Sequence, residues 1–233
     1  MRVPNAFMAP NSTLHHLKQT IKLAIPIILS QIGQNAFTFM DTLMVGRLGT
    51  IPLGASAFVN NVINIPMVLA IGASSAASVL TAQSFGAKNF HNCGKVLNNC
   101  LIFVSALSFV IILGLEILAP HLGLFRMPQE ITNISSGYYH MIAWSIYPFV
   151  LFFVLKHFSE ALSHPVVPLL FLGVGLFLNF ILNYVLIYGH WGFPAYGLTG
   201  SGLATLISRT VVVILLYAYV LKAEKYKRFQ VGF

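Results

Sequence analysis

The sequence predicts an all-α membrane protein, built as a bundle of six transmembrane helices. Hydrophobic residues make up 57% of the 233 residues, and charged residues only 8%. The apolar residues also occur in long runs that are separated by short breaks. A water-soluble domain usually carries about 25% charged residues. With so few charges, most outward-facing side chains must be solvated by lipid, so the bilayer is the expected surroundings of this chain.

Each expected span is a mostly apolar run, close to or longer than the roughly 20 residues that a helix needs to cross a bilayer. Glycine, proline or charge marks every break between the runs. The chain therefore divides into an N-terminal segment, residues 1–20, a transmembrane lobe, residues 21–221, and a basic C-terminal tail, residues 222–233. The expected spans are residues 21–45, 52–82, 93–118, 134–160, 166–188 and 199–221.

The lysines and arginines predict how the spans are oriented. The net charge of +8 would suggest a nucleic-acid partner in a soluble chain, but here the positive residues lie between the apolar runs, so no such partner is expected. Arg47 and Arg126 fall on one side, and Arg209 falls inside the sixth span. Because cytoplasmic loops carry the excess of positive charge, both termini are expected in the cytoplasm. Ten residues fall on that side: Arg2, Lys18, Lys22, Lys88, Lys95, Lys156, Lys222, Lys225, Lys227 and Arg228.

The first expected span carries a stripe of polar residues. Gln31, Gln34, Thr38 and Asp41 are spaced by three, four and three residues, which places them on one face of a helix. Asp41 is the only aspartate of the chain, and an ionisable group inside a span marks a functional site by default. The alternative is that Asp41 lies near the outer interface and pairs with Arg47.

Three further groups of polar residues fall inside expected spans. Asn179 and Asn183 are one turn apart in the fifth span, where their amide oxygens suit either a hard cation or hydrogen bonds between helices. Asn60 and Asn64 repeat this spacing in the second span, where packing is the simpler explanation. Thr205 follows a glycine-rich stretch that permits close helix approach, and its hydroxyl could join a cation site.

A metal site is the weaker hypothesis from the sequence. His157, Glu160 and His164 share a helix face at the end of the fourth span, with residue types that bind zinc, although such residues at a membrane interface are usually just solvated. Sequence motifs of zinc hydrolases, serine hydrolases and phosphate-binding loops are missing. No catalytic residue is therefore expected. Arg209 either turns outward to the interface or pairs with an acid.

Four segments, taken in order, resemble one family of transporters. They are DTLMVGRLG at 41–49, TAQSFGAK at 81–88, NFILNYVLIYGHWGFP at 179–194 and GSGLAT at 200–205. Together they are similar to the NorM-like branch of the multidrug and toxic compound extrusion (MATE) family, over residues 15–222. The resemblance implies the N-terminal lobe of a twelve-helix protein of the bacterial inner membrane, whose two lobes are parallel repeats. The second lobe would come from the same gene, a partner chain or a second copy, and the tail would begin an interlobe linker.

The resemblance also implies a function and assigns residues to it. The family implies a secondary active transporter, not an enzyme, that needs no cofactor and exports small organic cations or zwitterions in exchange for H⁺ or Na⁺. Some relatives have an aspartate where this chain has Asn183, so this chain would have one carboxylate instead of two. The implied cation-coupling residues are Asp41, Asn179, Asn183 and Thr205, and the implied substrate-cavity residues are Gln34, Thr38, Asn60 and Asn64.

Three other functions compete with this one. A flippase for lipid-linked saccharides from the same wider superfamily would line its cavity with more cationic residues, whereas here Arg209 is essentially alone and Lys156 lies near a span end. A membrane-embedded metal-dependent enzyme depends entirely on the His157 group. A purely structural membrane subunit would tolerate replacement of Asp41.

Overall fold

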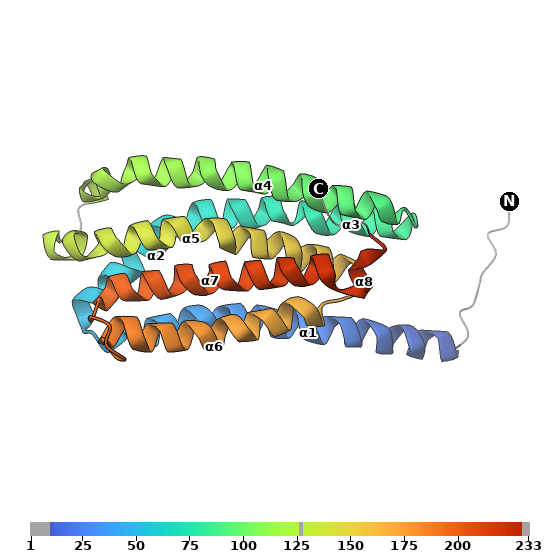
Figure 1. Ribbon diagram of the computed structural model, residues 1–233, viewed down its shortest axis with the longest axis horizontal. Helices are drawn as coiled ribbons and strands as arrows, with labels where there is room; N and C mark the ends of the chain where they lie inside the picture. Colours follow the sequence, from blue (N-terminus) through green and yellow to red (C-terminus); the bar gives the residue numbers. More distant parts are fainter. Residues whose placement is uncertain (1–9, 126–127, 230–233) are drawn as a thin grey trace.

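The computed structural model describes residues 10–125 and 128–229, so Arg2 and Arg126 lie outside it. It is a bundle of long helices that run along one axis (Figure 1). The described residues contain no strand. The elements are α1 (Pro10–Gly46), α2 (Thr50–Ser74), α3 (Ala76–Gly86), α4 (Phe90–Leu118), the 3-10 helix η1 (Ala119–Phe125), α5 (Gln129–Ala161), α6 (Val166–Tyr188), α7 (Gly197–Lys222) and α8 (Glu224–Lys227).

Six stretches of helix are long and apolar enough to cross a membrane, and they match the six predicted spans one for one. They are Thr20–Gly46, Thr50–Gly86, Phe90–Gly123, Gln129–Ala161, Val166–Tyr188 and Gly197–Lys222. The second span consists of α2 and α3, which are separated at Ser75. The predicted all-α six-helix bundle is therefore confirmed. Residues 10–20 belong to the same helix as the first span, and the membrane-capable part of that helix begins at Thr20.

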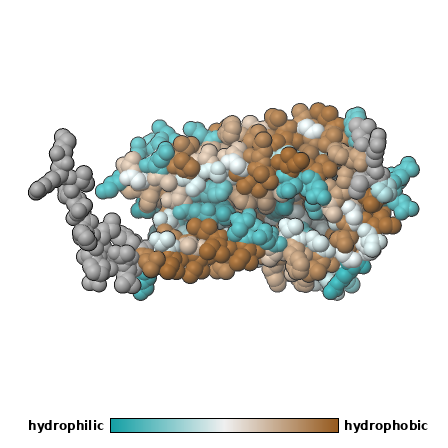
Figure 2. Space-filling view, turned by 180° about the vertical axis from the view of Figure 1, so that it is seen from behind, coloured by the Kyte–Doolittle hydropathy of each residue, from teal (hydrophilic) through white to brown (hydrophobic). Residues whose placement is uncertain are grey.

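Helix α5 lies at the centre of the bundle. It packs against α7, α2, α4 and α3. The most apolar 18-residue stretch of α5 is 67% buried inside the protein, whereas that of α1 is 17% buried. The outer helices instead expose large apolar side chains, such as Ile65, Val110 and Phe177. Figure 2 shows hydrophobic residues over much of one face, with hydrophilic residues gathered between them near the middle of the bundle. An apolar exterior of this kind fits a lipid environment.

The basic residues of the described chain gather at one end of the bundle. Lys18 and Lys22 lie near the start of α1, Lys88 lies in the turn between α3 and α4, and Lys222 ends α7. These segments meet at the end of the bundle where α8 lies (Figure 1). Arg47 follows α1 at the opposite end. The arrangement keeps the expected charge asymmetry, and the direction of the bundle across the membrane stays a prediction.

The segment that the sequence suggests is a basic tail folds back onto the lobe as far as Phe229. Tyr226 and Phe229 are fully buried, and both rings pack against Phe158 of α5. The Tyr226 hydroxyl donates a hydrogen bond to Ser159 Oγ at 3.0 Å, while burial raises the pKa of Tyr226 to about 12. The last described residues are therefore part of the fold, and residues 230–233 lie outside the described chain.

Small residues bring α7 close to α6, as the glycine-rich start of the sixth span predicts. A Cβ atom added to Gly200 would collide with the backbone carbonyl oxygen of Leu186 in α6. A Cβ atom on Gly175 of α6 would lie 2.7 Å from Val212 Cγ2 of α7. Backbone atoms cannot move aside as a flexible side chain can, so Gly200 sets the spacing between these two helices.

We expect Gly200→Ala to destabilise the protein. Forcing a methyl group against the α6 backbone should cost about 1–3 kcal/mol. The measurement is the apparent melting temperature of the detergent-solubilised protein. Gly114→Ala in α4 is the matched control, because a Cβ atom there would meet nothing within 4 Å. An equal melting temperature for both variants would contradict the close packing of α6 and α7.

Candidate functional site

Four predicted residues from three helices form one polar cluster around Asp41 of α1. Asn183 Nδ2 of α6 donates to Asp41 Oδ1 at 2.6 Å, and Thr205 Oγ1 of α7 donates to Asp41 Oδ2 at 3.1 Å. Asn183 Nδ2 also donates to Asn179 Oδ1 at 3.0 Å, and Asn179 Nδ2 lies 3.4 Å from Thr205 Oγ1. Each carboxylate oxygen of Asp41 thus has a donor, and the spacing of Asn179 and Asn183 by one turn lets one helix supply both amides.

The packing of the helices holds this cluster in place. Helix α6 contacts both α1 and α7, so the side chains of all three helices can reach one another around Asp41. Toward the end of α6, the Tyr188 hydroxyl donates to the backbone oxygen of Met44 in α1 at 2.9 Å. The close approach of α7 at Gly200 brings Thr205 within reach of α1.

One acceptor in the cluster has no partner among the described residues. Asn183 Oδ1 is buried and accepts no hydrogen bond from the described residues. Both bonds of this side chain are made by its Nδ2, which donates to Asp41 and Asn179. A buried carbonyl oxygen without a donor costs free energy. The cluster can therefore take one more proton donor or a cation without displacing an existing bond to that oxygen.

The alternative position of Asp41, paired with Arg47 at the interface, is wrong. Arg47 is exposed, and no ion pair between described residues joins it to Asp41. The carboxylate instead points to α6 and α7, because these helices supply the donors that lipid lacks.

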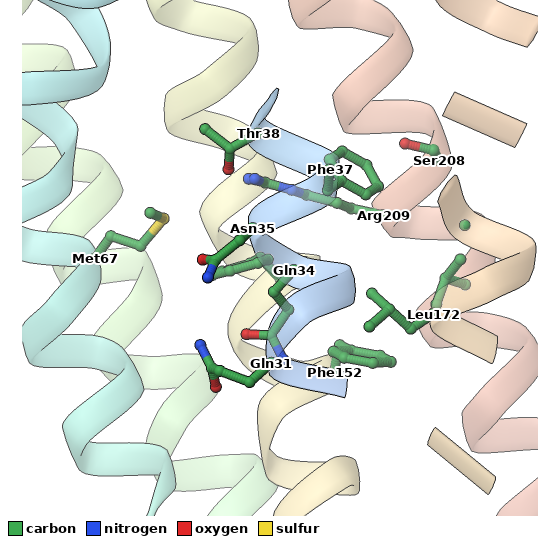
Figure 3. A pocket seen from close by; sticks show the side chains of 13 residues that line it. Gln31, Gln34, Asn35, Phe37, Thr38, Met67, Phe152, Leu172, Ser208 and Arg209 are labelled. Atoms are coloured by element: carbon green, nitrogen blue, oxygen red, sulfur yellow. The ribbon is translucent and has the colours of Figure 1, made fainter. Parts of the chain in front are cut away.

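Two adjoining cavities open beside the cluster. The first, of about 180 Å³, is lined by Gln31, Gln34, Asn35, Thr38 and Arg209 together with Phe37, Met67, Phe149, Phe152 and Leu172 (Figure 3). The second, of about 270 Å³, is lined by Asp41, Asn60, Asn61, Asn64, Tyr138, Thr205, Thr38 and Arg209. Both volumes lie below the range of roughly 300–1,000 Å³ that small-molecule sites usually occupy.

The predicted cavity residues divide between these two hollows. Gln34 lines the first cavity, Asn60 and Asn64 line the second, and Thr38 borders both. The Tyr138 hydroxyl lies 3.4 Å from Asn60 Oδ1, so Asn60 also has a packing partner. Asn60 therefore both packs against α5 and lines the second cavity.

Arg209 lines the second cavity together with Asp41, but no ion pair between described residues includes it. Its Nη1 donates to Ser145 Oγ of α5 at 2.7 Å, and the guanidinium lies 4.3 Å from the centroid of the Phe149 ring. Arg209 is four residues from Thr205, so both lie on one face of α7. This spacing could have indicated that Arg209 faces the same cavity as Thr205.

The group that suggested zinc does not assemble. Glu160 binds Lys156 at 3.1 Å, His157 Nδ1 lies 3.2 Å from the backbone oxygen of Ser74, and the His164 ring packs against Tyr226. Burial, followed by nearby Lys225 and Arg228, lowers the pKa of His164. In the described part of the chain, no three His, Cys, Asp or Glu residues lie together so that they could hold a metal ion. The zinc hypothesis is therefore wrong, because each side chain has a different partner.

Comparison with known proteins finds one family. The model of the MatE family matches residues 26–185. A probable multidrug resistance protein NorM of Mesorhizobium japonicum is 29% identical over 221 residues, which are 92% of this chain and 46% of the relative. The protein of the same name in Bradyrhizobium diazoefficiens is 31% identical over 206 residues, 88% of this chain and 44% of the relative. The chain thus spans about half the length of the curated relatives it matches.

Solved structures share the fold of this lobe. The Vibrio cholerae MATE transporter VcmN in its bent form matches with a TM-score of 0.83 at 20% identity, over 95% of this chain and 50% of that one. A eukaryotic MATE transporter matches with a TM-score of 0.84 at 18% identity, over 93% of this chain and 48% of that one. At these identities the likeness concerns the fold.

We expect the second cavity to be wet, which thiol labelling can test. In a variant with Cys93 and Cys100 replaced by alanine, Asn64→Cys should react with a membrane-impermeant maleimide, because thiolates form in water. Ile65→Cys is the matched control, since Ile65 is 78% exposed but lines neither cavity. It should react at least about tenfold more slowly, because apolar surroundings suppress the thiolate. Equal rates would argue against a water-filled cavity.

Proposed function

The chain belongs to the MatE family, and from this premise we propose that it forms the N-terminal lobe of an antiporter that exports small organic compounds. Members of this family are multidrug efflux transporters, secondary transporters and not enzymes. The exchanged ion is H⁺ or Na⁺, and the location is the bacterial inner membrane. The gathering of basic residues at one end of the bundle supports an orientation with both termini in the cytoplasm.

The polar cluster around Asp41 carries this proposal. It holds an acid inside a membrane-spanning bundle, next to two cavities with polar side chains in their lining. An ionisable group in such a position is expensive and marks an ion pathway. Asp41 binds the coupling ion, and Asn179, Asn183 and Thr205 surround it. A sodium ion would find oxygen atoms on all four side chains, which suits a hard cation.

A proton would rearrange the same cluster. Protonated Asp41 becomes a donor and needs an acceptor, which the unpartnered Asn183 Oδ1 can supply once the amide turns over. That turn breaks the bond from Asn183 Nδ2 to Asn179 Oδ1 within α6 and reverses the direction of the bond between Asn183 of α6 and Asp41 of α1. The ion thereby changes the hydrogen bonding between α6 and α1, and residues of α1 line both cavities.

Substrate export also requires a second lobe. The chain spans about half of its relatives, which supports a partner lobe from the same gene, a second polypeptide or a second copy. The substrate binds in the cavities on the face toward that lobe, and rocking of the lobes exposes it to either side. The ion drives export only by as much as its affinities for the two states differ.

The cavities favour organic cations or zwitterions over lipid-linked saccharides. A pyrophosphate-linked headgroup carries several negative charges and requires several cationic partners. Arg209 is the one lysine or arginine among the described residues that line the two cavities, and the nearby Lys156 is already paired with Glu160. The acid Asp41 in the second cavity suits a positively charged group instead.

We expect Asp41→Asn to abolish ion-driven efflux. The amide cannot take up a proton or offer a charged ligand to sodium, so export should fall by at least about tenfold. The measurement is drug efflux from cells or proteoliposomes with an imposed ion gradient. Glu224→Gln, which removes an exposed acid outside the cluster, should leave export unchanged. Unchanged efflux in Asp41→Asn would favour a purely structural subunit.

We expect Asn183→Asp to increase the dependence of efflux on sodium. A second carboxylate beside Asp41, at the position now 2.6 Å away, would have to share a proton or a cation with it. The half-saturating sodium concentration should fall by about tenfold, since added ligand charge tightens cation binding. Asn64→Asp is the control, because it adds an acid to the same cavity outside the cluster. If both variants responded alike, the cluster would not be the ion site.

A further inference from the structure

Arg209 has hydrogen-bonding capacity that the described protein does not use. A guanidinium offers five N–H donors, yet its one hydrogen bond here is to Ser145 Oγ at 2.7 Å. Phe149 and Phe37 lie along it, with ring centroids 4.3 and 5.9 Å from the guanidinium carbon. The aromatic contacts stabilise the charge without satisfying its N–H groups.

A second donor in the same cavity is also free. Gln34 Nε2 is buried and finds no acceptor among the described residues. Both Gln34 and Arg209 line the first cavity. Figure 3 shows the Arg209 side chain reaching across from α7 to the side of α1 that bears Asn35 and Thr38, with Gln34 further along α1.

The first cavity contains no acid to satisfy these donors. Its polar lining consists of amides and hydroxyls besides Arg209, and Asp41 lines only the second cavity. The buried Gln34 donor without an acceptor is costly, and the half-buried guanidinium carries a positive charge, so the cavity favours a ligand that brings negatively charged oxygens. The remaining lining is apolar, with Phe37, Met67 and Phe152 among it, which fits an aromatic or aliphatic ligand body.

We propose that Arg209 and Gln34 bind the carboxylate of an amphiphilic organic substrate, which makes Arg209 the residue that determines specificity for carboxylate-bearing compounds. This inference rests on the proposed transport function and names its substrate class. The planar fork of a guanidinium matches the two oxygens of a carboxylate. One arginine and one amide suit a single negative charge, unlike the several charges of a pyrophosphate.

The neighbouring acid narrows the class to zwitterions. Arg209 lines the second cavity as well, where it meets the surroundings of Asp41. A proton or sodium ion on Asp41 would strengthen the binding of an isolated anion, because it removes a negative charge nearby. The same event weakens the binding of a positive group next to Asp41. Exchange against the ion therefore needs a substrate with its carboxylate at Arg209 and its amine toward Asp41.

A matched pair of dyes tests this assignment. The probes are a rhodamine with a free carboxylate, which is a zwitterion, and its methyl ester, which is a cation of the same shape. Binding is measured by fluorescence anisotropy on the purified protein, produced as its natural reading frame encodes it. Arg209→Gln should weaken binding of the zwitterion by at least about tenfold and that of the ester by less than about twofold, since charge-assisted bonds are lost only with the former.

Further variants separate recognition from folding. Arg209→Lys should restore part of the preference, because the charge remains but the fork is lost. Lys222→Gln removes an exposed charge from the same helix and should change neither dye. If Arg209→Gln does not fold, Gln34→Glu tests the same pocket, since an added acid should repel the zwitterion and spare the ester.

The outcomes distinguish this inference from the transport function. A selective loss of zwitterion binding supports the role of Arg209. An equal loss of both dyes, or no loss of either, overturns that role while Asp41-dependent efflux still stands. A wild-type protein that binds neither dye and shows no ion-driven efflux overturns both proposals.

Discussion

An acid inside a membrane must find its hydrogen-bond donors within the protein, and Asp41 finds them on two other helices. The bonds from Asn183 and Thr205 therefore require α1, α6 and α7 to meet at one depth. Gly200 permits that approach, and the bond from Tyr188 to the end of α1 supports it. Much of the arrangement on this side of the bundle follows from the need to solvate one carboxylate.

The rest of the lobe is held together by the packing of hydrophobic side chains. Helix α5 supplies an apolar core that α2, α3, α4 and α7 cover, and most of the buried side chains in this packing are hydrophobic. At the basic end, Tyr226 and Phe229 close the core with aromatic contacts to Phe158. An apolar side and a polar side with unpaired groups thus lie in one bundle. The polar side is where a change in protonation has partners to rearrange.

The sequence was sufficient for the spans and for the residues that share a face of one helix, because both depend on spacing along a single element. Six apolar runs gave six helical spans, and the stripe from Gln31 to Asp41 lines the two cavities. Spacing could not say which faces meet. The pairing of Asp41 with Asn183, not with Arg47, depends on the contact between α1 and α6.

Other features were out of reach for the same reason. The sequence left two positions open for Arg209, and the contacts that place it, with Ser145 and Phe149 of α5, come from across the bundle. The basic tail contains too few apolar residues to suggest burial, yet Tyr226 and Phe229 pack against helix α5. The His157 group looked like a metal site only while its tertiary partners, Ser74 and Tyr226, were unknown.

The wall shared by the two cavities has a thermodynamic consequence. Thr38 and Arg209 border both, so an occupant of either cavity changes the surroundings of the other. Linkage is reciprocal: by whatever factor an ion at Asp41 alters the affinity for a ligand at Arg209, that ligand alters the affinity for the ion by the same factor. Titrating the ion at several ligand concentrations would therefore yield the coupling free energy of this lobe without any measurement of transport.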